Sequence, residues 1–177
     1  NMPSGETVDA TRQALITKIG ENMQVRRVTY IESTGLIAAY SHGARIGVLV
    51  DLASGDAETA KDIAMHVAAS NPAVLTSDDV PADMIAKERE IYTAQAAESG
   101  KPQEIIEKMV EGRVKSFLKE VSLCDQPFVK EPKQSVSQFL ASKKAEINGF
   151  TRFEVGEGIE KAESNFAEEV KAQAGLE

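Results

Sequence analysis

The sequence predicts an α+β protein: a small antiparallel sheet packed with helices, interrupted by an inserted antiparallel coiled-coil helical hairpin, with a C-terminal helix. Three observations support this class. Short apolar runs separated by turn residues occupy the first third of the chain, two long helical patterns follow, and another strand pattern appears after Gly149. The hydrophobic fraction is 42%, Trp is absent and aromatic residues make up only 5%, so the core must be aliphatic.

The first part of the chain is predicted to be a helix followed by strands. Apolar residues recur near helical spacing in Thr7–Met23, and Gly20 could end or break this helix near its end. β-Branched and aromatic residues then predict a first strand at Val25–Ile31, followed by strands at Leu36–Tyr40 and Ile46–Leu52. Because the links between these runs are short, we expect antiparallel pairing.

The middle of the chain is predicted to be helical. Ala57–Ser70 is a helix that stops before Pro72, and two longer helical patterns follow at Pro81–Ala97 and Gln103–Val121. The link 98–102 is short, so the two long helices must run antiparallel. Each has an apolar stripe wider than two helices can bury, which leaves the core or another molecule to cover the rest. The residues through which we expect self-association of this hairpin are Ile85, Ile91, Tyr92, Ile106 and Val110.

The last part of the chain is predicted to return to the sheet. A loop between Pro127 and Pro132 precedes a short helix at Val136–Lys143, and Phe150–Val155 reads as a fourth strand. If that strand joins the first sheet, the helical hairpin is an insertion between the third and fourth strands. Ile159–Ala174 is expected to be an amphipathic helix.

Charge and composition narrow the partners and the compartment. The net charge of -8 and the pI of about 4.9 argue against nucleic acid or an anionic membrane as the main partner, because both require a basic face. No apolar stretch approaches the ~20 residues of a membrane span. The single cysteine, Cys124, cannot form an internal disulfide, which fits a reducing cytoplasmic setting. Asn1 is not a natural translation start, so a processed product, a cut fragment or a tagged form is expected.

No catalytic constellation stands out among the residues. The glycines lack phosphate-loop spacing, the two histidines are not spaced as metal ligands, and no nucleophile elbow is present. His66 lies beside the apolar face of a helix and is expected to be a satisfied, partly buried histidine. His42 lies in a turn at a strand end, where side chains are displayed, and Tyr40 and Arg45 either contact a partner or only shape that turn. Two alternatives stay open: an enzyme that uses His42 or His66 with a carboxylate, and a purely structural dimerisation module.

Six segments of the chain closely resemble the elongation factor Ts family, in the order in which that family has them. They are KIGENMQVRRV (18–28), SHGARIGVLV (41–50), DIAMHVAAS (62–70), SGKPQEIIEKMVEGRVKSF (99–117), EVSLCDQPFV (120–129) and FTRFEVGEGIEK (150–161). The resemblance implies a factor that acts by binding elongation factor Tu and promoting release of its GDP, not an enzyme, with no cofactor and no metal. Carried over by motif, the residues implied to contact elongation factor Tu are Ile19, Gly20, Glu21, Asn22 and His42.

The resemblance also implies a division of the chain. Residues 1–24 would lead from a first core half that is absent, 25–75 with 127–158 would form the second core half, 76–126 the inserted hairpin, and 159–177 a C-terminal helical module. The Thr-Asp-Phe-Val motif of the family's first core half is not in this sequence, nor is the family's small N-terminal domain. We therefore expect a C-terminal portion that keeps much of the docking surface and has reduced exchange activity.

Overall fold

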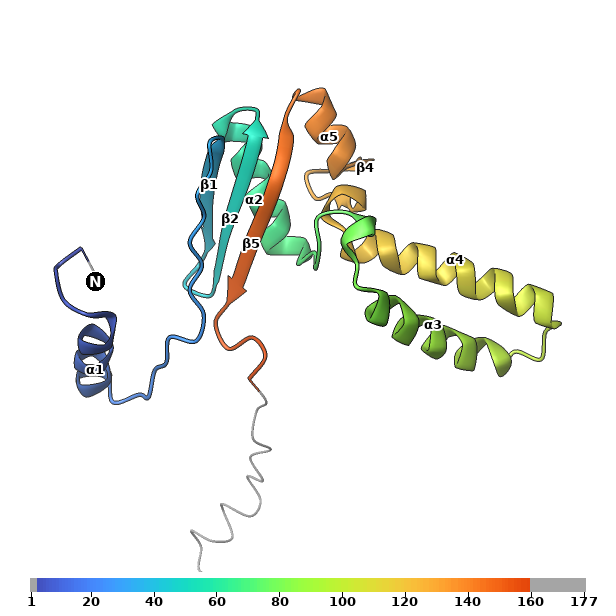
Figure 1. Cartoon of the computed structure of the whole chain (residues 1–177), viewed down its shortest axis with the longest axis horizontal. Helices are drawn as coiled ribbons and strands as arrows, with labels where there is room; N and C mark the ends of the chain where they lie inside the picture. Colours follow the sequence, from blue (N-terminus) through green and yellow to red (C-terminus); the bar gives the residue numbers. More distant parts are fainter. Residues whose placement is uncertain (1–2, 160–177) are drawn as a thin grey trace, which may run out of the picture. The chain divides into compact units, whose positions relative to one another are not determined.

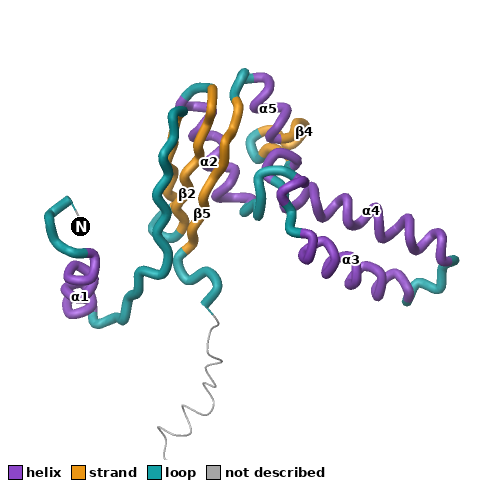
Figure 2. Tube along the Cα trace, in the orientation of Figure 1, coloured by secondary structure: helices purple, strands orange, loops and turns teal. Residues whose placement is uncertain are grey.

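The structure is a computed structural model that describes residues 3–159, and its chain divides into two compact units, residues 1–32 and 33–177. Figure 1 labels the helices α1–α5 and the strands β1, β2, β4 and β5 along the chain, and Figure 2 colours the same trace by secondary structure. The presence of helices together with small antiparallel sheets confirms the α+β class.

The first unit contains α1, Val8–Ile19, whose two ends are set by local hydrogen bonds. The Thr7 hydroxyl accepts from the Ala10 N–H at 3.1 Å, which caps the N-terminus. Gly20 has φ 81°, and its N–H donates to the Ile16 carbonyl at 2.8 Å. This left-handed cap ends the helix at Ile19, before Met23, where the sequence had predicted its end.

The prediction of a strand at Val25–Ile31 is wrong. These residues belong to no strand, and Val28 and Tyr30 are 83% and 84% exposed. A strand requires a neighbouring ladder to pair its N–H and C=O groups, and β propensity alone does not supply one.

The main sheet of the second unit has three strands in the order β1-β2-β5, and both pairings are antiparallel. They are β1 Leu36–His42, β2 Ile46–Ser54 and β5 Glu146–Glu154. β5 begins four residues before the predicted Phe150 and pairs with β2, as Figure 1 shows, so residues 55–145 come between two neighbouring strands. One face of β2, with Val48, Val50 and Leu52, is buried.

The helix α2 covers that buried face and has the predicted bounds, Ala57–Ser70. The Asp56 carboxylate accepts from the Thr59 N–H at 2.7 Å, and this hydrogen bond lowers the pKa of Asp56. Asn71, with φ 45°, ends the helix. Because both caps are encoded next to the helix, the sequence alone locates its ends.

The rest of the core comes from residues 123–142. Phe128 and Phe139 stack with ring centroids 4.2 Å apart, and α5, Val136–Ser142, adds Val136 and Leu140 to the same cluster. The segment predicted to be a loop contains a second small sheet, β3 Pro127–Phe128 paired with β4 Glu131–Ser135. Burial of Phe128 draws this segment onto the core, which the prolines and charges of the sequence do not indicate.

The two long helices are α3, Ala82–Ala97, and α4, Gln103–Val121, which pack side by side (Figures 1 and 2). Their coiled-coil character stays a prediction. Their root is held by backbone hydrogen bonds: Ala73 donates to Val121, and Leu123 donates to Val74. The 3₁₀ turns Ser77–Asp79 and Leu123–Asp125 lie at the same root, where the Ser77 hydroxyl bonds Asp125. The chain thus enters and leaves the hairpin along two paired segments.

No helix within residues 3–159 is long and apolar enough to cross a membrane. The amphipathic helix predicted at Ile159–Ala174 lies outside the described residues, apart from Ile159 itself.

Candidate functional site

The end of the sheet at the β1–β2 turn displays His42. β1 runs two residues beyond the predicted Tyr40, so His42 is the last residue of the strand and pairs with Ile46 instead of lying in the turn. The turn that follows contains Gly43, whose φ of 59° is a left-handed conformation that favours glycine. His42 remains exposed although its backbone is part of the ladder.

The His42 ring has a partner on its own strand. Tyr40 lies two residues earlier, so both side chains stand on the same face of β1. The Tyr40 hydroxyl and His42 Nδ1 are 3.2 Å apart, and the two ring centroids are 6.3 Å apart. Tyr40 is half-buried against the main core. The displayed imidazole is therefore tied to a side chain whose position the core fixes.

Arg45 is held by the neighbouring strand end. Its Nη2 lies 3.4 Å from Glu154 Oε1, and its carbonyl accepts from the Val155 N–H at 2.8 Å. The other oxygen of Glu154 accepts from Arg152 Nη2 at 2.8 Å, and the Arg152 side chain is only 8% exposed. Arg45 is thus linked to the end of β5, although its side chain is 75% exposed, and both predicted roles, shaping the turn and contacting a partner, stay predictions.

Sequence reasoning missed Arg152 and Glu154. The signal available was the alternation of charged residues within the strand pattern FTRFEVGEG, which is unusual for a buried strand. Arg152 and Glu154 pair with each other two residues apart, whereas Arg45 lies 109 positions from Glu154. Only the strand pairing therefore reveals that the ion pairs run from Arg45 through Glu154 to Arg152.

Ile19, Gly20, Glu21 and Asn22 lie in the first unit, at the C-terminal end of α1 and directly after it. Ile19 is exposed, as are the three residues that follow it. His42 belongs to the second unit, so the structure does not bring these residues and His42 into one described site.

His66 is a structural histidine. It is fully buried in α2, and both ring nitrogens are engaged: Nε2 lies 2.9 Å from Gln126 Oε1, and Nδ1 accepts from the Val129 N–H at 3.1 Å. Since Nδ1 is an acceptor, the ring proton is on Nε2 and is donated to Gln126. The sequence predicted a satisfied, partly buried histidine, and the structure places it deeper than that. Burial lowers the pKa of His66, opposed by the hydrogen bond to Gln126.

The free energy of unfolding should depend on the charge state of His66. The unfolded chain titrates this ring near its ordinary pKa of 6.5, whereas the pKa in the folded chain is lower. As the pH falls below about 6.5, the unfolded state takes up a proton that the folded state does not bind. The stabilisation of the folded chain that comes from keeping His66 neutral is therefore complete above that pH and is lost as the pH falls towards the pKa of the folded chain. Over that range the free energy of unfolding falls by at most ~1.4 kcal/mol per pH unit.

Denaturant unfolding of the parent chain and of His66→Gln, measured from pH 7.5 down to 5, would test this. The parent should lose stability more steeply than the variant in that window, because the variant lacks the titrating ring. Asp56 and Asp79, whose pKa values are lowered by hydrogen bonds, contribute only at more acid pH. If the free energy of unfolding fell with pH equally in the two chains, His66 would not be the group that titrates on unfolding.

The hairpin residues divide into two groups. Ile106 and Val110 are buried between α3 and α4, with Ile85 and Tyr92 packed against them, whereas Ile91 is exposed. Four of the five residues predicted for self-association thus contact the partner helix of the same chain. The exposed large apolar residues within α3 and α4 are Met84, Ile91 and Ile105.

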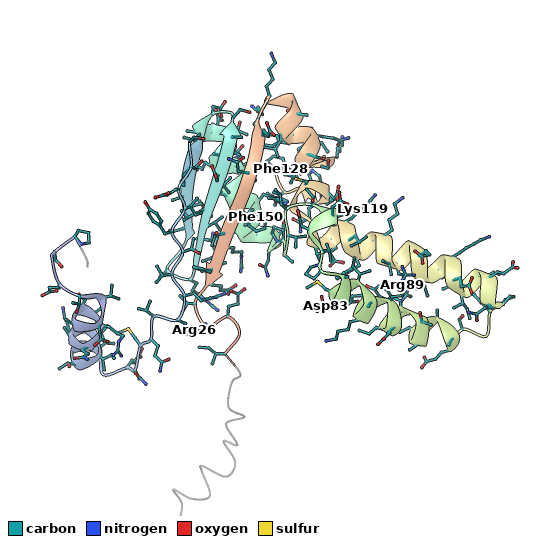
Figure 3. The ribbon with its side chains drawn as sticks, viewed as in Figure 1. Arg26, Asp83, Arg89, Lys119, Phe128 and Phe150 are labelled. Atoms are coloured by element: carbon teal, nitrogen blue, oxygen red, sulfur yellow. The ribbon has the colours of Figure 1, made fainter. Side chains whose placement is uncertain are left out.

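Polar contacts across the hairpin supplement this packing. Arg89 on α3, labelled in Figure 3, forms an ion pair with Glu111 on α4. This pair raises the pKa of Arg89 and lowers the pKa of Glu111. Both side chains are exposed, so solvent screens this pair and it adds little to the stability of the hairpin. Arg113 on α4 lies over the Tyr92 ring at 5.7 Å and donates to Gln95 on α3 at 2.6 Å.

Cys124 lies half-buried at the root of the hairpin. Burial raises the pKa of its thiol, and Asp125 and Asp79 raise it further, so the neutral thiol is favoured. Within residues 3–159, no group of three or more His, Cys, Asp or Glu side chains is arranged to hold a metal ion.

Comparison with known proteins adds information that the geometry does not contain. The family model described as "Elongation factor TS" matches residues 1–157. Elongation factor Ts of Legionella pneumophila (strain Lens) is 58% identical over 172 residues, which is 97% of this chain and 59% of that protein. The elongation factor Ts of Methylococcus capsulatus is 60% identical over 173 residues, covering 97% of this chain and 59% of that protein. The elongation factor Ts of Alcanivorax borkumensis is 56% identical over 173 residues, which is 98% of this chain and 61% of that protein. The chain thus spans about three fifths of the length of these curated relatives.

Proposed function

The chain belongs to the elongation factor Ts family, and on this premise we propose that it binds elongation factor Tu and promotes the release of GDP from it. The family match, at more than half identity over nearly the whole chain, carries the proposal. The display of His42 at a rigid strand end supports it, since recognition residues are found where a scaffold presents them to solvent.

The proposed contact residues are Ile19–Asn22 in the first unit and His42 in the second. Ile19 is an exposed apolar side chain at a helix end, and Gly20 turns the chain there so that Glu21 and Asn22 follow in exposed positions. His42 adds an imidazole whose position Tyr40 restrains. These are contact groups, and the proposed activity requires no covalent step from them.

Exchange by binding alone follows from linkage. If the factor weakens GDP binding to its partner by some ratio, GDP weakens the factor's binding by the same ratio. Contacts made equally in the GDP-bound and empty states shift nothing, so only contacts that differ between the two states promote release. A coupling of about 1.4 kcal/mol changes the GDP affinity tenfold.

The test is stopped-flow release of a fluorescent GDP from elongation factor Tu at saturating concentrations of this chain. We expect binding, with release accelerated far less than by a full-length relative, because the Thr-Asp-Phe-Val motif is not in this sequence. His42→Ala should weaken binding about three- to tenfold, which corresponds to one hydrogen bond at an interface.

His66→Gln is the matched control, because it removes the other histidine, which is buried and faces the core. Its affinity for elongation factor Tu should equal that of the parent wherever the variant is folded. Equal affinity of His42→Ala and the parent would remove His42 from the proposed contact residues. Full exchange activity would show that the coupling lies in the residues present here.

A further inference from the structure

The geometry around His42 shows which of its ring nitrogens has a partner within the chain. Nδ1 is directed at the Tyr40 hydroxyl, 3.2 Å away, so Nε2 is the nitrogen left for an outside partner. Tyr40 packs against the main core, and its backbone pairs with Val48 in the middle strand. The hydroxyl is therefore a fixed point from which the exposed ring is oriented.

The direction of this hydrogen bond decides the chemistry of Nε2. A neutral imidazole has one N–H and one lone pair. A phenol hydroxyl is the better donor of the pair, and an imidazole lone pair is the better acceptor, so the Tyr40 hydroxyl donates to Nδ1. The ring proton is then on Nε2, the nitrogen that Tyr40 does not engage, and Nε2 is a donor.

The turn that holds the ring is itself braced. Glu154 bridges Arg45 of the turn and the buried Arg152, and the Arg45 carbonyl accepts from the Val155 N–H. These contacts connect the turn to the end of β5 within the same chain. A donor that is oriented in advance loses less entropy on binding.

We propose that Tyr40 is a positioning residue that holds His42 as the Nε2–H tautomer, so that His42 donates a hydrogen bond to an oxygen acceptor on the bound protein. The identity of that protein rests on the proposed function, whereas the tautomer is a property of this chain alone. The two parts therefore have separate tests.

The tautomer is tested by the ring-nitrogen chemical shifts of the full chain labelled with ¹⁵N at histidine, in alkaline buffer. His42 should show one dominant form, Nε2–H, and Tyr40→Phe should shift it towards a mixture. His66 is an internal reference, since its own Nε2–H form depends on Gln126 and Val129 and should not change. Tyr30→Phe removes an exposed hydroxyl elsewhere and should leave His42 unchanged. A dominant Nδ1–H form in the parent, or no change in Tyr40→Phe, would overturn the proposal.

The donor role is tested by the affinity of His42 variants for elongation factor Tu. His42→Gln places an amide donor near the position of Nε2 and should bind within about threefold of the parent, whereas His42→Glu offers only acceptors and should bind more than about tenfold more weakly. Tyr40→Phe should weaken binding about threefold through loss of orientation. Better binding by His42→Glu than by His42→Gln would refute a donor role. Absence of any binding by the parent would overturn the proposed function, and the nitrogen shifts would still decide the tautomer.

Discussion

Replacing His66 with alanine is expected to lower the free energy of unfolding by about 3 kcal/mol. The ring is fully buried, with its centroid 5.8 Å from that of Phe128, so its removal leaves a cavity in the main core. It also leaves the Gln126 carbonyl oxygen without its donor and the Val129 N–H without its acceptor. These two groups tie residues 126–129 to α2, so the small sheet β3–β4 should loosen first.

The measurement is equilibrium denaturant unfolding followed by far-ultraviolet circular dichroism. His42→Ala is the matched control, because it deletes the same ring from an exposed strand end and should change stability by no more than about 0.5 kcal/mol. If both alanine variants lost the same stability, His66 would not have the structural role that its two hydrogen bonds indicate.

Replacing Ile106 with aspartate is expected to melt the helical hairpin while the sheet stays folded. Ile106 is 8% exposed and packs with Val110, Val114 and Ala96 in a cluster separate from the main core. A carboxylate there has no partner, and burying it costs about 4 kcal/mol or more. The hairpin has few other buried contacts, so it should open locally without unfolding the rest.

Ile105→Asp is the control for this change. The two isoleucines are neighbours of identical chemistry, but Ile105 is 46% exposed, so its replacement should leave the helical signal intact. Amide hydrogen exchange should then show lost protection in α3 and α4 for Ile106→Asp only, with β2 protected in both variants. Preserved protection of α4 in Ile106→Asp would show that the residue does not hold the two helices together.

The same pair of variants separates hairpin stability from self-association. We predicted self-association from an apolar stripe, and the structure accounts for most of that stripe within one chain. What is left on the outside includes Ile91 and Ile105. If copies of this chain associate through the exposed residues, sedimentation should show a dimer that Ile105→Asp dissolves without loss of helix. If the parent chain remains a monomer at high concentration, the prediction of self-association is wrong.

Features encoded by neighbouring residues could be predicted from the sequence. The bounds of α2 follow from Asp56 at one end and Asn71 at the other, and the antiparallel hairpin of β1 and β2 follows from a short glycine-containing turn. The strand predicted at 25–31 shows the opposite case, because its residues have β propensity but no ladder forms there. Strand formation depends on a partner that the local sequence does not specify.

The sequence by itself determined the family and the helices with local caps. It also distinguished His42, at a strand end, from His66, on the apolar face of a helix. Only the tertiary structure decided which distant residues hold His66, namely Gln126, 60 positions away, and Val129, 63 positions away. The same is true of the pairing of Arg45 with Glu154 across 109 positions. It also decided that Ile106 faces α3 while Ile105 faces outward. The physical reason is that caps and turns are satisfied within a few residues, whereas burial and ion pairing depend on which distant segments the folded chain brings together.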